Sequence, residues 1–370
     1  MSCWPDPVQS LLLRGGLLSG DDRAGALSVL EDLARREGLP AGNERLLPLV
    51  YLALRDAAED FPSLMGIVEP VYLRSWQRSE VQAVMMARAL AALNGAAIPS
   101  IVLKGPTLSC SYGDPALRPA SDLDILTSVE RYEDALAALS LAGWRTTVDP
   151  PGDAVLHHAL NLSGPAVDID LHRHALEEFV GTTHDLELWE SSEPFVIHDH
   201  ATRSLSAGDR LIHVFAHGLR WNPTSNVHWI ADALLLLRAE GEGFDWERFA
   251  HRARVFDLTL PVWEGLRYLA QSFEIVVPRA VTLDLAASRP SPIRRLAYAA
   301  RQRAPGDRGI LDATALRVEM RRRRLLALDL PAPAAFASSR RLLSIRGVTR
   351  TAEGVWRALR VSLSSAIRRS

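Results

Sequence analysis

The chain has 370 residues, of which 48% are hydrophobic and 23% charged, with a formal net charge of -2. These values are ordinary for a globular protein, exclude a low-complexity or fibrous chain, and leave room for two or three domains. Its two cysteines exclude a disulfide framework; with no signal-peptide pattern at the start, they predict a cytoplasmic protein. No uninterrupted apolar run is long enough to cross a bilayer, so we expect no transmembrane segment.

Charge is distributed unevenly along the chain. Residues 289–370 carry 19 arginines against five acids, a formal charge of +14, whereas the residues before them carry 23 bases against 39 acids. A basic end of this kind is typical of contact with a polyanion such as a nucleic acid. The alternative is that the basic end docks on the acidic body of its own chain.

The first part of the chain, to about residue 94, is predicted to be helical. Apolar residues recur at spacings of three and four in 25–38 and 43–60, and a longer pattern of the same kind covers 69–93. We therefore expect an N-terminal helical region over residues 1–97.

The pattern changes at Pro99. Short apolar or alternating runs predict strands in 100–105, 121–128 and 144–149, and a Ser-Gly-Pro turn predicts a hairpin within 154–175. An amphipathic helix is expected over 129–144. Because strand patterns are almost confined to this stretch, we predict a small α/β core at 98–200.

Downstream the helical pattern returns. We expect a helical substrate-pocket region over 201–288 and an arginine-rich helical region over 289–370, with a linker near 329–339 and an amphipathic end over 353–369. The predicted fold class is α+β, mostly helical, with a small mixed-sheet core set between helical regions.

Two of the predicted strands carry paired acids in an apolar setting. Asp122 and Asp124 are two residues apart, so on a strand both side chains point to one face, and Asp168 and Asp170 repeat the arrangement. Like charges on one face of a buried strand are costly unless a cation lies between them. A single such pair is more typical of a water-facing edge strand, but two strands together favour a divalent-metal site.

The only lysine of the chain, Lys104, ends the strand before the acidic pair and is followed by Gly105. An ammonium is a compact point charge that can reach one phosphate oxygen, unlike the wide guanidinium fork. The glycine lets backbone approach a phosphate closely. Chance placement of one lysine is the alternative, but its position favours a phosphate contact.

These motifs resemble a known family. The run "LKGPTLSCSYGDPALRPASDLDIL", then "VDIDLH", then "HVFAHGLRW" and "WIADALLLL" is similar to the bacterial uncharacterised nucleotidyltransferase family of the polymerase-β-like superfamily. The resemblance covers roughly residues 71–237. One departure is Pro106 after Gly105, where the superfamily has glycine or serine, because proline lacks an amide that can meet a phosphate.

The resemblance implies roles for particular residues. Asp122, Asp124 and Asp170 are the expected catalytic metal ligands, holding two Mg²⁺ ions, with Mn²⁺ as an alternative. Asp170 is preferred to Asp168 as the third ligand because it stands in an Asp-Leu-His sequence, but either can fill that place. The residues expected to bind the nucleotide are Lys104, Gly105, Arg118 and Ser121. Those expected to contact the substrate or support the site are Asp168, His172 and His217.

Several residues of the predicted helices have open roles. His213 and His217 share one helical face and could form a zinc pair, but no suitably placed third ligand supports one, so we do not expect a zinc site. Trp229 and Asp232 also match the family motif. We expect Trp229 to pack in the core and Asp232 to be a buried polar anchor.

The implied function is transfer of a nucleoside monophosphate from an NTP to an unidentified acceptor, with release of pyrophosphate. The acceptor can be a small molecule, a peptide, a protein or an RNA end. The alternative is a non-catalytic nucleotide-binding or RNA-binding module that retains the fold.

Overall fold

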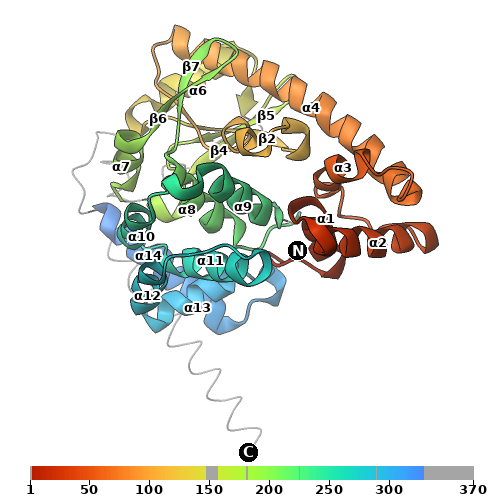
Figure 1. Ribbon diagram of the computed structural model, residues 1–370. Helices are drawn as coiled ribbons and strands as arrows, with labels where there is room; N and C mark the ends of the chain where they lie inside the picture. Colours follow the sequence, from red (N-terminus) through yellow and green to blue (C-terminus); the bar gives the residue numbers. More distant parts are fainter. Residues whose placement is uncertain (1, 147–156, 181, 225, 289, 329–370) are drawn as a thin grey trace, which may run out of the picture.

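The computed structural model describes residues 2–146, 157–180, 182–224, 226–288 and 290–328. Helices dominate this part of the chain, and they surround one mixed sheet (Figure 1). The predicted mostly helical α+β organisation is therefore confirmed. The α-helices are α1 Pro7–Leu17, α2 Gly20–Arg36, α3 Leu47–Arg55, α4 Pro62–Gly95, α5 Pro106–Ser109, α6 Tyr132–Leu141, α7 His184–Ser191, α8 Ala207–Gly218, α9 His228–Glu240, α10 Trp246–Val255, α11 Thr259–Phe273, α12 Arg279–Ala287, α13 Pro292–Arg301 and α14 Ile310–Leu328.

The sheet has seven strands in the order β3-β4-β5-β2-β1-β7-β6. Its centre mixes directions: β2 runs parallel to β5 and antiparallel to β1, while β1 runs parallel to β7. Antiparallel hairpins complete both edges. The strands are β1 Ile101–Val102, β2 Asp122–Leu126, β3 Arg145–Thr146, β4 Ala159–Ser163, β5 Asp168–His172, β6 Glu193–Ile197 and β7 His200–Ser204.

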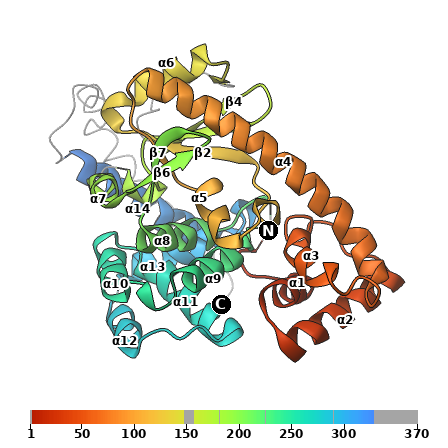
Figure 2. The same cartoon turned by 45° about the horizontal axis from the view of Figure 1, so that its top comes forward.

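The long helix α4 links the N-terminal helices to the sheet. It extends from the group α1–α3 and crosses one face of the sheet (Figures 1 and 2). Its C-terminal half and α6 bury apolar side chains against that face, among them Met86, Leu90 and Leu139. The predicted helices of this region are confirmed; α1 was covered only by the general expectation of a helical N-terminus.

The alternation of β2 assigns its two faces. Leu123 and Ile125 pack into the cluster under α4 and α6, as do Ile169 and Leu171 of the neighbouring β5. Since successive side chains on a strand point to opposite faces, the aspartates between these residues face the other side of the sheet. Helices α8 and α9 lie on that side, between the sheet and the C-terminal helices (Figures 1 and 2).

One hairpin was not predicted. Strands β6 and β7 pair from Glu193↔Ser204 to Ile197↔His200 and extend the sheet beside β1. The expectation that strands would be almost confined to 99–176 was therefore wrong. The two residues of the turn, His198 and Asp199, both have positive φ (45° and 67°), a conformation usually signalled by Asn-Gly.

The C-terminal helices α10–α14 pack below α8 and α9 (Figure 1). The predicted linker near 329–339 and the amphipathic end at 353–369 lie outside the described residues. Among the helices that are described, none is both long and apolar enough to cross a membrane.

Candidate active site

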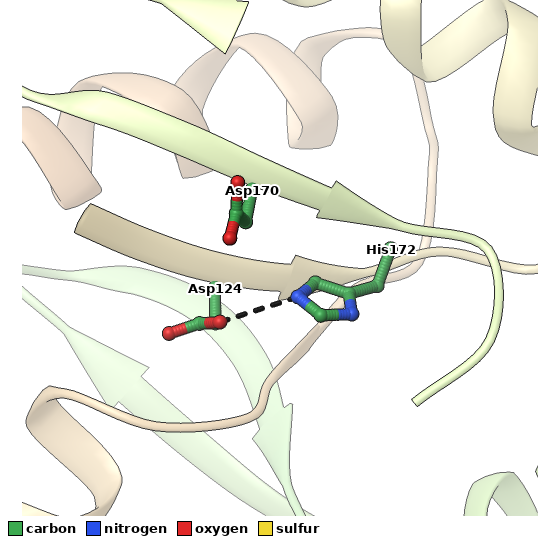
Figure 3. A group of neighbouring side chains, drawn as sticks. All are labelled: Asp124, Asp170 and His172. Carbon is green, nitrogen blue, oxygen red and sulfur yellow. Dashed lines mark hydrogen bonds and ion pairs between the residues drawn. The ribbon is translucent and has the colours of Figure 1, made fainter. Parts of the chain in front are cut away.

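Two acids and a histidine meet on the sheet face that is turned toward α8 and α9. Asp124 of β2 lies in register with Asp170 of β5, and His172 ends β5 (Figure 3). One ligand atom from each of these three side chains lies within 4.8 Å of the others. Parallel neighbours in register present their side chains to the same face, which brings together residues that are 46 positions apart in sequence.

Asp124 is buried, with 4% of its surface exposed, and two basic side chains contact it. Lys104 Nζ donates to Asp124 Oδ1 at 2.7 Å, and His172 Nε2 lies 3.2 Å from the same oxygen. Burial alone would raise the pKa of Asp124, but the charge of Lys104 and then the contact with His172 outweigh burial and hold that pKa below its usual range. Asp124 is therefore ionised.

Lys104 is bound to protein groups rather than exposed at the end of its strand. Its ammonium also lies 3.2 Å from His217 Nε2, on α8. An ammonium has three N–H groups, so two contacts leave one for a phosphate oxygen. The proposed phosphate contact is thus sterically compatible with the ion pair, although the pair itself was not predicted.

Asp122 lies beside this cluster. It is half-buried at the start of β2, and its carboxylate accepts a hydrogen bond of 3.0 Å from Ser121 Oγ. Burial, followed by the negative charge of Asp124, raises the pKa of Asp122; Lys104 opposes this and Asp170 adds to it. A group with this electrostatic environment is stabilised by a cation.

Asp168 and Asp170 differ in their surroundings. Asp168 Oδ1 accepts from the amide of Gly164 at 3.2 Å, in the turn between β4 and β5. Asp170 accepts from Asn161 Nδ2 at 3.1 Å and lines the same cavity as Asp122 and Asp124. The structure therefore groups Asp170, rather than Asp168, with the other two acids.

Arg118 lines the same cavity, where it forms an ion pair with an acid of α9. Its Nε and Nη2 donate to the two carboxylate oxygens of Asp232 at 2.6 and 2.9 Å, and Tyr112 Oη donates to the same carboxylate at 2.7 Å. Burial opposes the charge of Asp232, but Arg118 outweighs it and lowers the pKa of that carboxyl. Asp232 is thus the buried polar anchor that the sequence suggested.

The cavity that contains these groups has a volume of about 340 Å³. Sequence reasoning missed Arg45 and His228 in its lining, but identified the three acids, Lys104, Gly105, Arg118, Ser121 and His217. Neither stands in a motif: Arg45 precedes α3 in the N-terminal region, and His228 is the first residue of α9. Trp229, next to His228, is buried and makes edge-to-face contacts with Trp4 and Phe215, as expected of a core residue.

Residues 41–274 match a family model described as "Uncharacterised nucleotidyltransferase". A comparison with curated proteins found no match.

Three solved structures show distant similarity. The solution structure of the antibiotic-resistance factor ANT(2'')-Ia is 16% identical, covers 53% of this chain and 97% of its own, and gives a TM-score of 0.34. The crystal structure of ANT(2")-Ia in complex with adenylyl-2"-tobramycin is 15% identical, covers 48% of this chain and 97% of its own, and gives a TM-score of 0.34. An antigenic nucleotidyltransferase-like protein from Paracoccidioides brasiliensis is 16% identical, covers 57% of this chain and 92% of its own, and gives a TM-score of 0.35. Similarity at this level assigns no role to individual residues.

Proposed function

Because the chain belongs to the uncharacterised nucleotidyltransferase family, we propose that it transfers a nucleoside monophosphate from an NTP to an acceptor and releases pyrophosphate. The observation that supports this proposal best is the registered pair Asp124 and Asp170, which meets Asp122 and Lys104 in one cavity. A non-catalytic binding module would have no need to keep this costly concentration of acids.

The residues fit a divalent cation. The carboxylates of Asp122, Asp124 and Asp170 line one cavity, and oxygen donors of this kind suit Mg²⁺, with Mn²⁺ as the alternative because His172 offers a nitrogen nearby. When bound, such ions neutralise the triphosphate and polarise the phosphorus under attack. We propose two ions, as the family resemblance implies.

The protein's own groups then have separate tasks. Lys104 would donate its remaining N–H to a phosphate oxygen. Gly105 has a φ of 63°, and a side-chain carbon added to it would meet no atom within 4 Å, so its open backbone would allow phosphate to approach. Asp170 would accept a proton from the acceptor while the oxygen or other nucleophile of the acceptor bonds to the α-phosphorus. The bond from that phosphorus to the bridging oxygen then breaks, and pyrophosphate leaves.

The test is to incubate the protein with Mg²⁺, each of the four α-labelled NTPs and candidate acceptors, beside an Asp122→Ala/Asp124→Ala variant. We expect label transfer, or NTP-dependent pyrophosphate release, that is lost in the double variant. The matched control is Asp168→Ala, because the carboxylate of Asp168 accepts a hydrogen bond from the β4–β5 turn. Transfer that survives loss of Asp122 and Asp124 would refute the metal-site proposal.

We further propose a reducing, cytoplasmic setting, since both cysteines are free thiols, Cys3 buried and Cys110 exposed.

A further inference from the structure

A second part of the cavity lining, away from the acids, combines three features that favour an anion. They are the guanidinium of Arg45, the imidazole of His228 and the N-terminal turn of α9. We call this set the Arg45–His228 wall. It joins the N-terminal helical region to the helices that follow the sheet, and none of its members belongs to the motifs that identify the metal site.

Arg45 is a half-buried cation with few partners. One of its five N–H groups, on Nη2, donates to the carbonyl of Pro119 at 3.2 Å. No carboxylate lies within 4 Å of its guanidinium among the described residues. Two acids, Asp122 and Asp232, act on the charge of Arg45 from farther away, and Asp232 already carries the bidentate pair with Arg118. The cavity lining therefore includes a guanidinium that no described carboxylate contacts.

The electrostatics of Arg45 agree with this geometry. Burial, then the positive charge of Arg118, lowers the pKa of Arg45, and the charges of Asp122 and Asp232 offset that effect only in part. An oxyanion beside the guanidinium would add negative charge there, and two of its oxygens could accept parallel N–H bonds from the planar arginine fork.

His228 supplies the second feature. Only 5% of its surface is exposed, and neither ring nitrogen has a hydrogen-bond partner within the described part of the chain. Buried polar groups are almost always hydrogen-bonded, so this imidazole in the cavity lining lacks a partner that a bound ligand could supply.

The third feature is the helix that His228 begins. Helix α9 has 13 residues, its first turn contains no acid, and no described side chain caps its N-terminus. The amides of Trp229 and Ile230 already donate to the carbonyls of Asn226 and Val227, so what this end of the helix offers an anion is its dipole. Arg45 and His228 therefore lie where the backbone also favours an anion.

We propose that the Arg45–His228 wall binds an anionic oxygen group of a substrate. Two sources share this chemistry: the terminal phosphates of the NTP, and a phosphate or carboxylate on the acceptor. The identity of the substrate rests on the proposed function, but the binding of an oxyanion does not.

The experiment measures oxyanion binding by calorimetry without divalent ions. The probes are inorganic pyrophosphate, inorganic phosphate and acetate, and the proteins are the wild type, Arg45→Gln, Arg45→Lys and His228→Phe. We expect at least one probe to bind the wild type, and Arg45→Gln to weaken it about tenfold or more. Arg45→Lys, which keeps the charge but loses the fork, should recover only part of the affinity.

His228→Phe distinguishes binding from stability. Phenylalanine keeps the ring and removes two nitrogens that bond to no described protein group, so the variant should fold with unchanged or higher stability yet bind the probe more weakly. The matched charge control is Arg36→Gln, since Arg36 is 70% exposed on α2, and it should bind like the wild type.

Further measurements with an NTP analogue that resists cleavage between the α- and β-phosphates, and with the corresponding nucleoside, separate the two sources. A loss in Arg45→Gln that affects the analogue but not the nucleoside assigns the wall to the triphosphate. A loss that affects added phosphate or acetate on the analogue-saturated protein assigns it to the acceptor. Equal affinity of wild type and Arg45→Gln for every probe, or no binding at all, would overturn the proposal. Because no transfer is measured, this failure is separate from a failure of the enzymatic function.

Discussion

A single carboxylate, Asp124, shows how the site is stabilised. It is buried, ionised and held by Lys104 at 2.7 Å and His172 at 3.2 Å. Removing one member of a buried ion pair leaves the other uncompensated, which costs about 3 kcal/mol. The lysine that we assign to phosphate contact therefore also has a role in folding.

We predict that Lys104→Met lowers the free energy of unfolding by about 3 kcal/mol, measured by urea denaturation without divalent ions. The double variant Lys104→Met/Asp124→Asn should recover most of the loss, because the neutral amide no longer needs a cation. If the single and double variants are equally unstable, the lysine contributes through packing rather than charge.

His228 gives a pH dependence whose sign follows from its burial. Burial lowers the pKa of His228 to about 3; nearby Asp232 opposes this shift, while Arg45 and Arg118 add to it. An unfolded histidine has a pKa near 6.5, so below that value the unfolded chain binds a proton that the native state refuses. The stabilising effect of the neutral ring is complete above pH 6.5 and is lost as the pH falls toward 3.

We expect the unfolding free energy of the wild type to fall between pH 7.5 and pH 5, with up to about 2 kcal/mol of the loss due to His228. His228→Phe should reduce that loss by this amount. His251→Gln, which changes an exposed histidine on α10, should follow the wild type. A His228→Phe protein with the same pH dependence as the wild type would contradict the assignment.

The residues of the site were predictable to the extent that they stand in short patterns. The two-residue spacing of the acids places them on one face, and the Lys-Gly after a strand is visible in the sequence. By contrast, Arg118 and Asp232 are 114 positions apart, and Arg45 carries no local signal. Their proximity depends on how α3, α9 and the sheet pack, which no short window of sequence contains.

At the scale of elements, the contact of α8 with α9 sets the position of the cavity. Gly218, at the end of α8, faces Trp229 of α9, and a side-chain carbon built at Gly218 would lie 2.3 Å from Trp229 Cβ. Glycine therefore lets the two helices approach closely. A larger residue would move the start of α9, where His228 and Asp232 lie.

We predict that Gly218→Ala destabilises the protein by about 2 kcal/mol, because overpacking forces backbone shifts. Oxyanion affinity should fall with it, because α9 forms part of the Arg45–His228 wall. The matched control is Gly66→Ala in α4, where no atom lies within 4 Å of the added carbon; it should gain about 0.5–1 kcal/mol. Thermal unfolding of both variants tests this, and a stable Gly218→Ala protein would show that the helices can separate freely.

Elements were predictable where periodicity is clear. The aspartate-bearing strands and the helices from α8 to α11 follow the expected patterns. The hairpin β6–β7 was missed because β6 contains Pro194, because β7 is mostly polar, and because its turn uses His198 and Asp199. Pairing with β1, a tertiary contact, determines that these residues form strands.

For the whole molecule, the uneven distribution of charge has a structural counterpart in the described part of the basic end. Arg294 and Arg322 pair with Asp257, and Arg301 pairs with Glu178 and Glu177. These contacts agree with the alternative in which basic residues dock on the acidic body. Polyanion binding by residues 329–370 stays a prediction.

Arg301 is the test of this docking, because it lies at the end of α13, 17% exposed, against Glu178, whose side chain is 11% exposed. Its carbonyl also accepts from the amide of Trp221, just after α8. We predict that Arg301→Gln lowers the unfolding free energy by about 2 kcal/mol, since Glu178 loses its cation while most of its side chain stays shielded from water. Arg295→Gln, an exposed change in the same helix, should cost less than about 0.5 kcal/mol.

Urea denaturation at low and high salt measures both variants. The effect of Arg301→Gln should persist in salt, because pairs shielded from solvent are screened weakly. Equal, salt-sensitive losses in both variants would mean that α13 is held by general attraction between a basic helix and an acidic body, without a specific contact.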